Sequence, residues 1–158
     1  MLLGRMARPL TAGEIAALRP VFGDELNYPN VRIHRGAGLN LRALIAHLNG
    51  NPAIALGRHI HIAAAHYRDD YAGDLNAFAG FIAHEAVHVW QWTKGRLNPV
   101  RYLWQYWTWL HHGYDIRAVT AESRFDDLGY DQQAEAVRLY VLGDVARLGP
   151  VLTQRLPL

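Results

Sequence analysis

One segment, residues 74–95, restricts the fold of this chain more than any other part of its sequence. Asp74 has a side chain suited to a helix N-cap, and Gly95 has the backbone freedom of a residue that ends a helix. We therefore expect a long helix over residues 75–94, with one apolar face packed against the rest of the fold. The apolar residues of that face are Leu75, Phe78, Ile82 and Val89.

The middle of this segment carries an HExxH motif, formed by His84, Glu85 and His88. Histidines four residues apart lie on one helical face, about one turn apart, so both imidazoles can bind one zinc ion. Glu85 is rotated by about 100° from His84 and can instead reach a water molecule that the metal activates. It would then act as general base while this water attacks a carbonyl group.

The same pattern could arise in a helix by accident. The chain contains nine histidines and five glutamates, and a random order of its residues would produce about 0.02 such motifs. Here the motif lies inside an apolar helix, where buried imidazole and carboxylate groups need partners. The chain has no cysteine, so a metal must be held by histidine, aspartate or glutamate. These observations favour a metal site.

The third ligand is not found in the same helix. The extended HExxHxxGxxH pattern would require a glycine and a histidine where this chain has Gln91 and Lys94. An acid from a later helix is the other common solution, and Asp131 and Glu135 share one helical face. One of them could bind zinc while the other orients a ligand histidine. Alternatively, Asp131 could cap its helix and Glu135 could face solvent.

Other residues are weaker candidates for the surroundings of the metal. Gln91 follows His88 by about one turn and could support it through a hydrogen bond. Glu122 could supply the acid in place of Asp131. A nitrogen ligand could also come from the pair His111 and His112.

A substrate cleft has its own candidate residues. His59 and His61 share one face of an alternating segment and could flank the substrate, although an exposed strand face is the favoured explanation. The hydroxyl of Tyr114 or Tyr130 could donate to an oxyanion. Residues 102–109 form an aromatic cluster that suits either a core wall or an apolar rim for a peptide. Its rings belong to Tyr102, Trp104, Tyr106, Trp107 and Trp109.

The remaining periodic segments alternate between helix and strand. Helices are expected over residues 12–18, 39–48 and 130–148, and strands over 31–34 and 59–62. With 158 residues, of which 51% are hydrophobic, the chain should form a single domain, residues 1–158, around one core. We therefore expect an α+β fold in which a small sheet packs on the long HExxH helix, with further helices towards the C-terminus.

Charge and hydropathy limit the partners and the location. The net charge is +2 without any basic block, which argues against a nucleic-acid partner. The longest apolar run, around residues 77–83, is too short for a transmembrane segment. Arg5 and Arg8 interrupt the N-terminal apolar residues, so we expect no secretory signal and a cytoplasmic location.

Four segments together carry a resemblance to a known family. They are Arg8-Pro9-Leu10, Val21-Phe22-Gly23-Asp24, Val31-Arg32-Ile33-His34 and the ten residues from Ile82 to Gln91. The chain resembles the core domain linked to extracellular contractile injection systems, together with its Vgr-related bacterial relatives. Many unrelated zincins share HExxH, whereas a VRIH segment followed by HExxHxxQ is considerably more specific.

The resemblance implies a zincin-like metallopeptidase of the gluzincin type. It implies His84 and His88 as zinc ligands and Glu85 as general base. In relatives the late helix starts with Glu-Gln-Gln, which maps the acidic ligand onto Asp131. Aspartate is shorter by one methylene, about 1.5 Å, so either this helix lies closer or Glu135 replaces Asp131 as ligand.

The favoured function is a zinc-dependent metallopeptidase that holds one Zn²⁺ per chain and hydrolyses a peptide or protein substrate. The alternative is a non-catalytic, zinc-containing binding or adaptor domain associated with a contractile injection or secretion system, which could also export the chain. An open fourth coordination position would favour the enzyme, and a closed one the adaptor. A two-metal carboxylate site would require a second Glu-x-x-His sequence, which the chain lacks.

Overall fold

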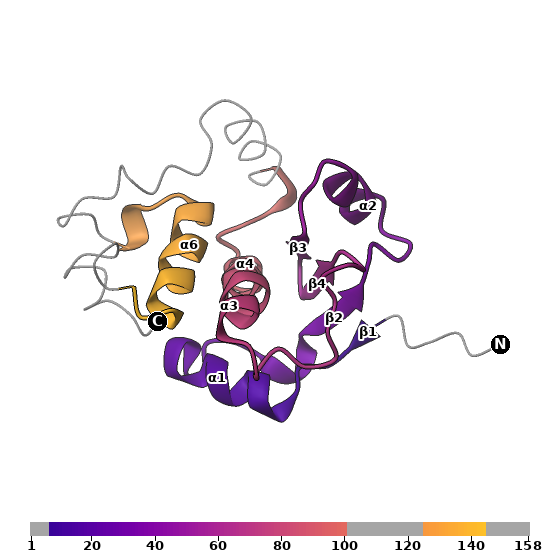
Figure 1. Cartoon of the computed structure of the whole chain (residues 1–158). Helices are drawn as coiled ribbons and strands as arrows, with labels where there is room; N and C mark the ends of the chain where they lie inside the picture. The colour runs from indigo at the N-terminus through magenta and orange to yellow at the C-terminus, as the bar shows by residue number, and fades with distance from the viewer. Residues whose placement is uncertain (1–6, 101–124, 145–158) are drawn as a thin grey trace.

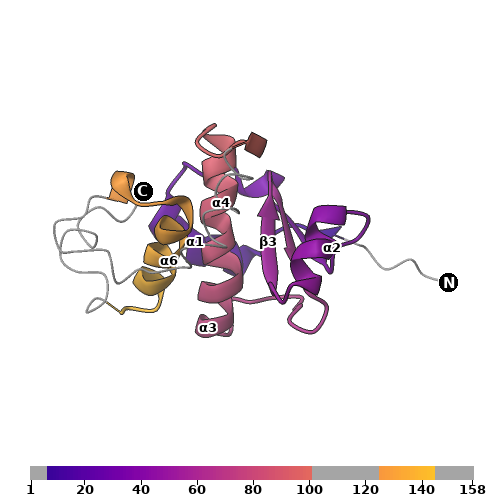
Figure 2. The same ribbon diagram turned by 90° about the horizontal axis from the view of Figure 1, so that it is seen from above.

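The computed structural model describes residues 7–100 and 125–144. A central helical rod, made of α3 (Leu75–Ala77), η2 (Phe78–Ala83) and α4 (His84–Thr93), separates a β-sheet from α6 (Tyr130–Val141) (Figure 1). Seen from above, α6, α4, the sheet and α2 (Leu41–Leu48) follow one another as successive layers (Figure 2). The α+β class expected from the sequence is confirmed.

A small mixed sheet forms one wall of the site. Within the described residues it has four strands in the order β1-β2-β4-β3. β2 and β4 run parallel, with Ile33 opposite Ile60, and the other two pairs are antiparallel. β3 therefore forms an edge of the sheet, and α4 packs on β3 and β4. The strands are β1 (Ala7–Arg8), β2 (Arg32–Arg35), β3 (Ala53–Leu56) and β4 (His59–Ile62).

The central rod occupies the segment expected to be a long helix. The Asp74 carboxylate accepts a hydrogen bond from the backbone N–H of Ala77 at 3.0 Å, as an N-cap does. Gly95, with φ +66°, ends the rod. The sequence did not indicate that η2 is a π-helical turn, in which the His84 N–H donates to the Ala79 carbonyl. Such a turn inserts one extra residue directly before the HExxH motif.

The first helix is longer than its sequence pattern suggested. α1 (Ala12–Phe22) starts with a capping box between Thr11 and Glu14, and it continues through Pro20 to Phe22, with Gly23 as its C-cap. The missing N–H of a proline removes only one hydrogen bond near the helix end. Burial of Val21 and Phe22, at 2% and 0% exposure, holds this last turn in the core.

Several other boundaries also differ from those expected. β1 and β3 were not anticipated, because β1 has two residues and β3 is an apolar run that does not alternate. α2 begins two residues late, where the Asn40 side chain caps it. α6 ends at Val141 rather than near residue 148, because Gly143 has a φ of +71°.

The core lies where the central rod meets the sheet, α1 and α6. Ile33, Ile60 and Ile62 of the sheet, Val87 of α4 and Val137 of α6 are at most 1% exposed. This contact with two layers holds α4 in place on both sides. No helix within residues 7–100 and 125–144 is long and apolar enough to cross a membrane.

Candidate metal centre

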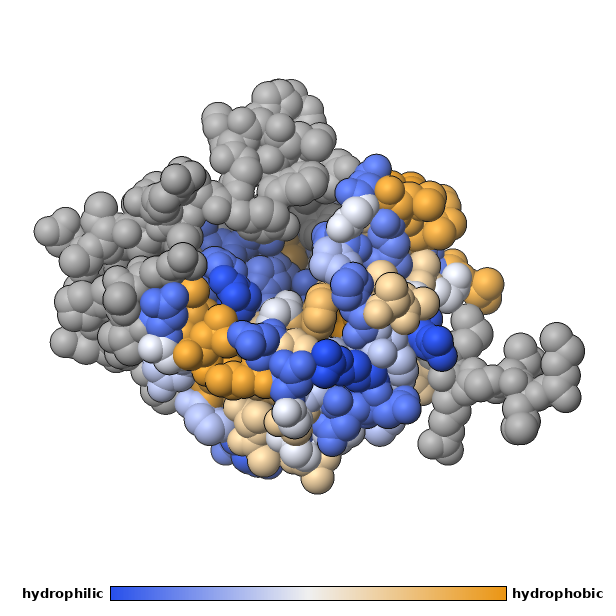
Figure 3. Space-filling model, in the orientation of Figure 1, coloured by the Kyte–Doolittle hydropathy of each residue, from blue (hydrophilic) through white to orange (hydrophobic). Residues whose placement is uncertain are grey.

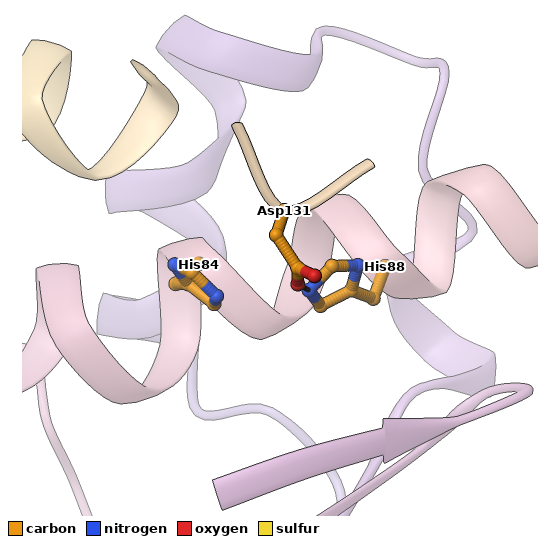
Figure 4. A group of neighbouring side chains, drawn as sticks. All are labelled: His84, His88 and Asp131. Atoms are coloured by element: carbon orange, nitrogen blue, oxygen red, sulfur yellow. Dashed lines mark ion pairs between the residues drawn. The ribbon is translucent and has the colours of Figure 1, made fainter. Parts of the chain in front are cut away.

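His84 and His88 project from the same face of α4. Their ring centroids lie 5.3 Å apart, with ring planes at 74° (Figure 4). The helix places them one turn apart, as the spacing of four residues requires. Both side chains are largely shielded, with 16% and 12% of their surface exposed. α4 thus presents two neighbouring nitrogen donors on its side facing α6.

Asp131 reaches this pair from the first turn of α6. Its Oδ1 lies 3.2 Å from Nε2 of His88 (Figure 4). The helix N-cap is Gly129, and its N–H donates to the Gln132 side chain at 2.9 Å. Asp131 is therefore not needed as a cap and turns towards α4. Donor atoms of His84, His88 and Asp131 all lie within 4.8 Å of one another, and they form the sole such group among the described residues.

Gln91 fixes the orientation of the His88 ring. The Gln91 side-chain amide donates to the backbone carbonyl of Tyr130 at 3.0 Å and to the carbonyl oxygen of Gln133 at 2.9 Å. Its own carbonyl oxygen must then face His88 Nδ1, which lies 2.9 Å away. The His88 Nδ1 therefore donates, and Nε2 is directed at Asp131. This places Gln91 in the supporting position that the sequence indicated.

Glu135 belongs to the His84 side of the site. Its Oε2 lies 4.0 Å from the Nδ1 of His84, and both carboxylate oxygens accept hydrogen bonds from Arg138 at 2.6–2.7 Å. This bidentate ion pair restrains Glu135 one turn after Asp131. The arrangement suits Glu135 as a partner of His84 and Asp131 as the metal ligand. Glu135 is absent from the group whose donor atoms converge.

Glu85 points from α4 towards the sheet and is 6% exposed. Its Oε2 is buried and has no hydrogen-bond partner among the described residues. Burial raises the pKa of Glu85 to about 7, although a backbone hydrogen bond from Ala55 and the charge of His88 oppose the shift. A carboxylate with a pKa near neutrality is suited to accept and release a proton.

The two histidines have opposite protonation preferences when no metal is bound. Burial and the charge of His88 lower the pKa of His84 to about 3, so its imidazole is neutral. Burial also disfavours the charged form of His88, but the hydrogen bond to Asp131 and its charge outweigh this and raise the pKa to about 9. A metal ion at Nε2 of His88 would therefore have to displace a proton.

A cleft of about 530 Å³ opens beside these residues. One wall is the edge strand β3 together with the segment that follows α2, and the other is α6. The floor is provided by α4 and by Gly80 of the π turn. The side chains of the candidate centre that line it are His84, Glu85, His88, Asp131 and Glu135.

The expectation that His59 and His61 line the cleft is wrong. They lie on β4 in a separate cluster with His34, whose Nε2 is 2.9 Å from His59 Nδ1 and whose ring stacks on His61. Neither residue lines the cleft beside α4. The reason is the two-residue period of a strand, which turns Ile60 and Ile62 into the core and the histidines to the opposite face.

The other residues expected near the site lie elsewhere in the structure or outside the described residues. The Tyr130 hydroxyl donates to the backbone carbonyl of Arg96 at 2.7 Å, so it is engaged away from the histidine pair. Tyr114, Glu122, the pair His111 and His112, and the aromatic cluster of residues 102–109 lie outside the described residues.

Two parts of the site, Arg138 and β3, were not predicted from the sequence. Arg138 could have been found from its spacing of three residues from Glu135, which is typical of a helical ion pair. β3 gave no usable signal, because four apolar residues in a row fit either a strand or a helix. Its place beside α4 depends on pairing with β4, which is a tertiary contact.

The residues present fit a zinc ion. Two imidazoles and one carboxylate form a donor set that zinc accepts, and such sets leave a fourth position open. Gln91 holds one ligand histidine, and Glu135 approaches the other, as supporting groups do at metal sites. The Oε2 atom of Glu85, next to the site, is buried without a hydrogen-bond partner among the described residues. Folded proteins rarely bury such an atom without a functional reason.

Comparisons with known proteins add two findings. Residues 9–96, more than half of the chain, match the eCIS core domain family. The structure is similar to the effector domain of Pseudomonas aeruginosa VgrG2b, with a TM-score of 0.71 and 25% sequence identity; the match covers 98% of this chain and 86% of that one. No curated protein sequence matches the chain. Asp131 lies outside the family match, whereas the structural match covers nearly the whole chain.

Proposed function

The chain belongs to the eCIS core domain family, and we propose that it acts in a contractile injection system as a zinc-containing binding or adaptor domain. The family match and the similarity to a VgrG effector domain support the association with such a system. They support a role in binding another protein of the apparatus better than they support catalysis, because neither names a peptidase. In this role the apparatus could also carry the chain out of the cell.

The proposed metal is one Zn²⁺ per chain, held by His84, His88 and Asp131. The observation that carries this proposal is the convergence of their donor atoms within 4.8 Å at the junction of α4 and α6. Binding there would link two helices from distant parts of the sequence and so stabilise the fold.

A second candidate function, peptide hydrolysis, is favoured by Glu85 and the cleft. Such an enzyme would be a zincin-like, gluzincin-type metallopeptidase. Zinc would supply a Lewis acid that polarises a carbonyl and activates water. Glu85, which lines the cleft beside the two histidines, would accept a proton from a water molecule and pass it to the leaving amine. β3 is an edge strand of the described sheet and lines the cleft, so an extended peptide could lie alongside it.

Metal content tests the first part of the proposal. The full chain, purified without added metal, should contain about one zinc ion by elemental analysis. His84→Ala and His88→Ala should lose it, whereas His66→Ala, at an exposed histidine, should retain it. Full zinc content in both ligand variants would refute the assigned site.

Cleavage of a peptide library separates the enzyme from the adaptor. If the chain hydrolyses peptides, Glu85→Gln should retain zinc and lose activity by roughly 10²–10⁴-fold. Glu25→Gln, a surface change beside Lys94, is the control and should leave activity unchanged. Equal cleavage by wild type and Glu85→Gln would exclude the catalytic role. Zinc binding without cleavage by any form would favour the adaptor.

A further inference from the structure

α2 exposes large apolar side chains, which helices of folded domains normally bury. The exposed residues recur at the spacing i, i+3, i+4 and i+7, so they form one continuous stripe. They are Leu41, Leu44, Ile45 and Leu48, at 67%, 45%, 49% and 77% exposure. The opposite side of α2 packs towards the sheet through a small residue, Ala43, which is fully buried. The apolar face of this helix therefore points away from the core.

These four residues, called the α2 stripe below, dominate the exposed apolar surface of the described residues. Leu39, just before α2, extends the stripe and is 100% exposed. Leu75 and Val100 are the other large apolar residues exposed to a similar degree there, and they lie outside α2. Figure 3 shows the apolar surface over α2 next to strongly hydrophilic residues. A contiguous apolar patch with a polar rim is typical of an interaction surface.

The charged residues in the segment around α2 are all basic. The chain has 14 acidic residues, yet none occurs between residues 26 and 68, a range that includes α2 and the strands β2, β3 and β4. Arg42 lies on α2 and is exposed, whereas the guanidinium of Arg35, at the end of β2, lies 5.9 Å from the ring centroid of Tyr67, on the face of the sheet shared with Ile33. Arg42 takes part in no ion pair with any residue of the described ranges. A partner for this face would therefore need an apolar layer bordered by negative charge.

We propose that the α2 face binds an anionic lipid surface. The α2 stripe would insert at the boundary between headgroups and acyl chains, while Arg42 contacts a lipid phosphate. A bilayer of anionic lipids provides an apolar layer directly below a plane of negative charge, which matches both features. A second copy of this chain fits less well, because it would bring two acid-free, positively charged faces together.

Binding through α2 would also set the orientation of the cleft relative to the lipid surface. Ala46 of α2 and Asn49, its C-cap, belong to the residues that line the cleft. A chain bound by the α2 stripe would therefore hold one wall of the cleft close to the lipid surface. The inference itself rests on α2 and its charges alone and does not depend on the proposed metal centre.

Vesicle co-sedimentation with the full chain tests the proposal. Vesicles of phosphatidylcholine and phosphatidylglycerol in equal parts should bind the wild type, and vesicles of phosphatidylcholine alone should bind it much more weakly. Leu44→Gln combined with Leu48→Gln should reduce binding by roughly tenfold or more, because two apolar side chains no longer insert. Raising the salt from about 0.1 M to about 1 M should also weaken binding, because charges are then screened over about 3 Å.

The matched control is Leu75→Gln combined with Val100→Gln. These residues are 55% and 76% exposed, close to the values of Leu44 and Leu48, so the control removes a similar apolar surface elsewhere. It should bind vesicles as the wild type does, and thermal unfolding should show that both double variants are folded. The proposal is overturned if the wild type does not bind anionic vesicles, which would point to a protein partner. Equal losses in both double variants, or equal binding to both vesicle types, would overturn it as well.

Discussion

Asp131 reaches His88 because neighbouring residues fix the first turn of α6. Gln132 caps this turn through the Gly129 N–H, and Gln91 of α4 donates to the Tyr130 carbonyl at 3.0 Å. Together these contacts bring α6 close enough for a short carboxylate, 3.2 Å from His88. The short carboxylate of an aspartate therefore suffices to reach His88.

Substitution of the two acids should separate their roles. Asp131→Ala should abolish zinc binding, because only two protein ligands remain. Glu135→Ala removes a partner of His84 and should weaken affinity by roughly 10–100-fold. Asp131→Glu should be tolerated. Zinc titration of the three variants measures this order, and the reverse order would identify Glu135 as the ligand.

The affinity for zinc should depend steeply on pH. Without metal, His88 carries a proton up to a pKa of about 9, because Asp131 stabilises the charged ring more than burial disfavours it. Zinc must displace this proton, so affinity should rise by about tenfold per pH unit as the pH increases towards 9. Competition titrations at several pH values measure the slope. A flat profile would show that His88 is neutral in the metal-free protein.

The same proton affects the stability of the metal-free fold. The folded-state pKa of His88 lies above its ordinary value of 6.5. Its contribution to the free energy of unfolding is therefore complete below about pH 6.5 and is lost as the pH rises through about 9. Zinc should remove this dependence, because the bound metal occupies the same nitrogen.

At the scale of elements, α4 and α6 are joined by a chain of side-chain amides. Gln91 contacts His88, Tyr130 and Gln133, and the Gln133 amide in turn donates to the Phe125 carbonyl at 2.9 Å. Gln91 and Gln133 are 0% and 3% exposed. The polar groups of the two glutamines are satisfied mainly by one another and by backbone carbonyls. This chain of amides therefore fixes both the ring of His88 and the start of α6.

Gln91→Leu should break this junction. The buried groups left without partners should lower the free energy of unfolding by about 1–3 kcal/mol. Zinc affinity should fall by roughly 10–100-fold, because the His88 ring loses its hydrogen bond. Gln133→Leu is the matched control, since it disturbs the same chain of amides but leaves the hydrogen bond between Gln91 and His88. Chemical denaturation and zinc titration measure both effects. Equal losses of affinity in the two variants would contradict an orienting role specific to Gln91.

For the whole molecule, Glu14 joins the N-terminal segment to the loop before the central rod, 57 residues away in the sequence. Its carboxylate is 0% exposed and accepts hydrogen bonds from the Arg8 guanidinium at 2.7–2.8 Å. It also accepts from the backbone N–H groups of Thr11 and Tyr71. These contacts join β1, the start of α1 and the loop that leads to the central rod. A buried charge with this many partners stabilises the assembled fold only while every partner is present.

Glu14→Gln should therefore strongly destabilise the protein. Arg8, whose side chain is 13% exposed, would lose the charge that compensates its own, and we expect a loss of about 3–5 kcal/mol in the free energy of unfolding. Asp24→Asn is the control, because the pair of Arg19 and Asp24 is exposed and should change stability little. Urea denaturation of both variants tests this. Similar midpoints for the two would show that Glu14 contributes no more than a surface ion pair.

Local features of this protein follow from patterns in its sequence. Spacing placed His84 and His88 on one face, and caps defined the ends of the central rod, because both depend on residues within a few positions of one another. It also indicated Gln91 beside His88, and the α+β class. These are properties of a single helix or of its neighbouring turns.

Contacts between distant residues, in contrast, could not be predicted from such patterns. The approach of Asp131 to His88 and the place of β3 at the cleft depend on how α6 and the sheet pack on α4. The histidines of β4 turned away from the cleft because the core required Ile60 and Ile62. The period of a strand indicates which residues share a face, but not which face will be buried. That choice is made by the packing of all layers together, and therefore no local pattern could supply it.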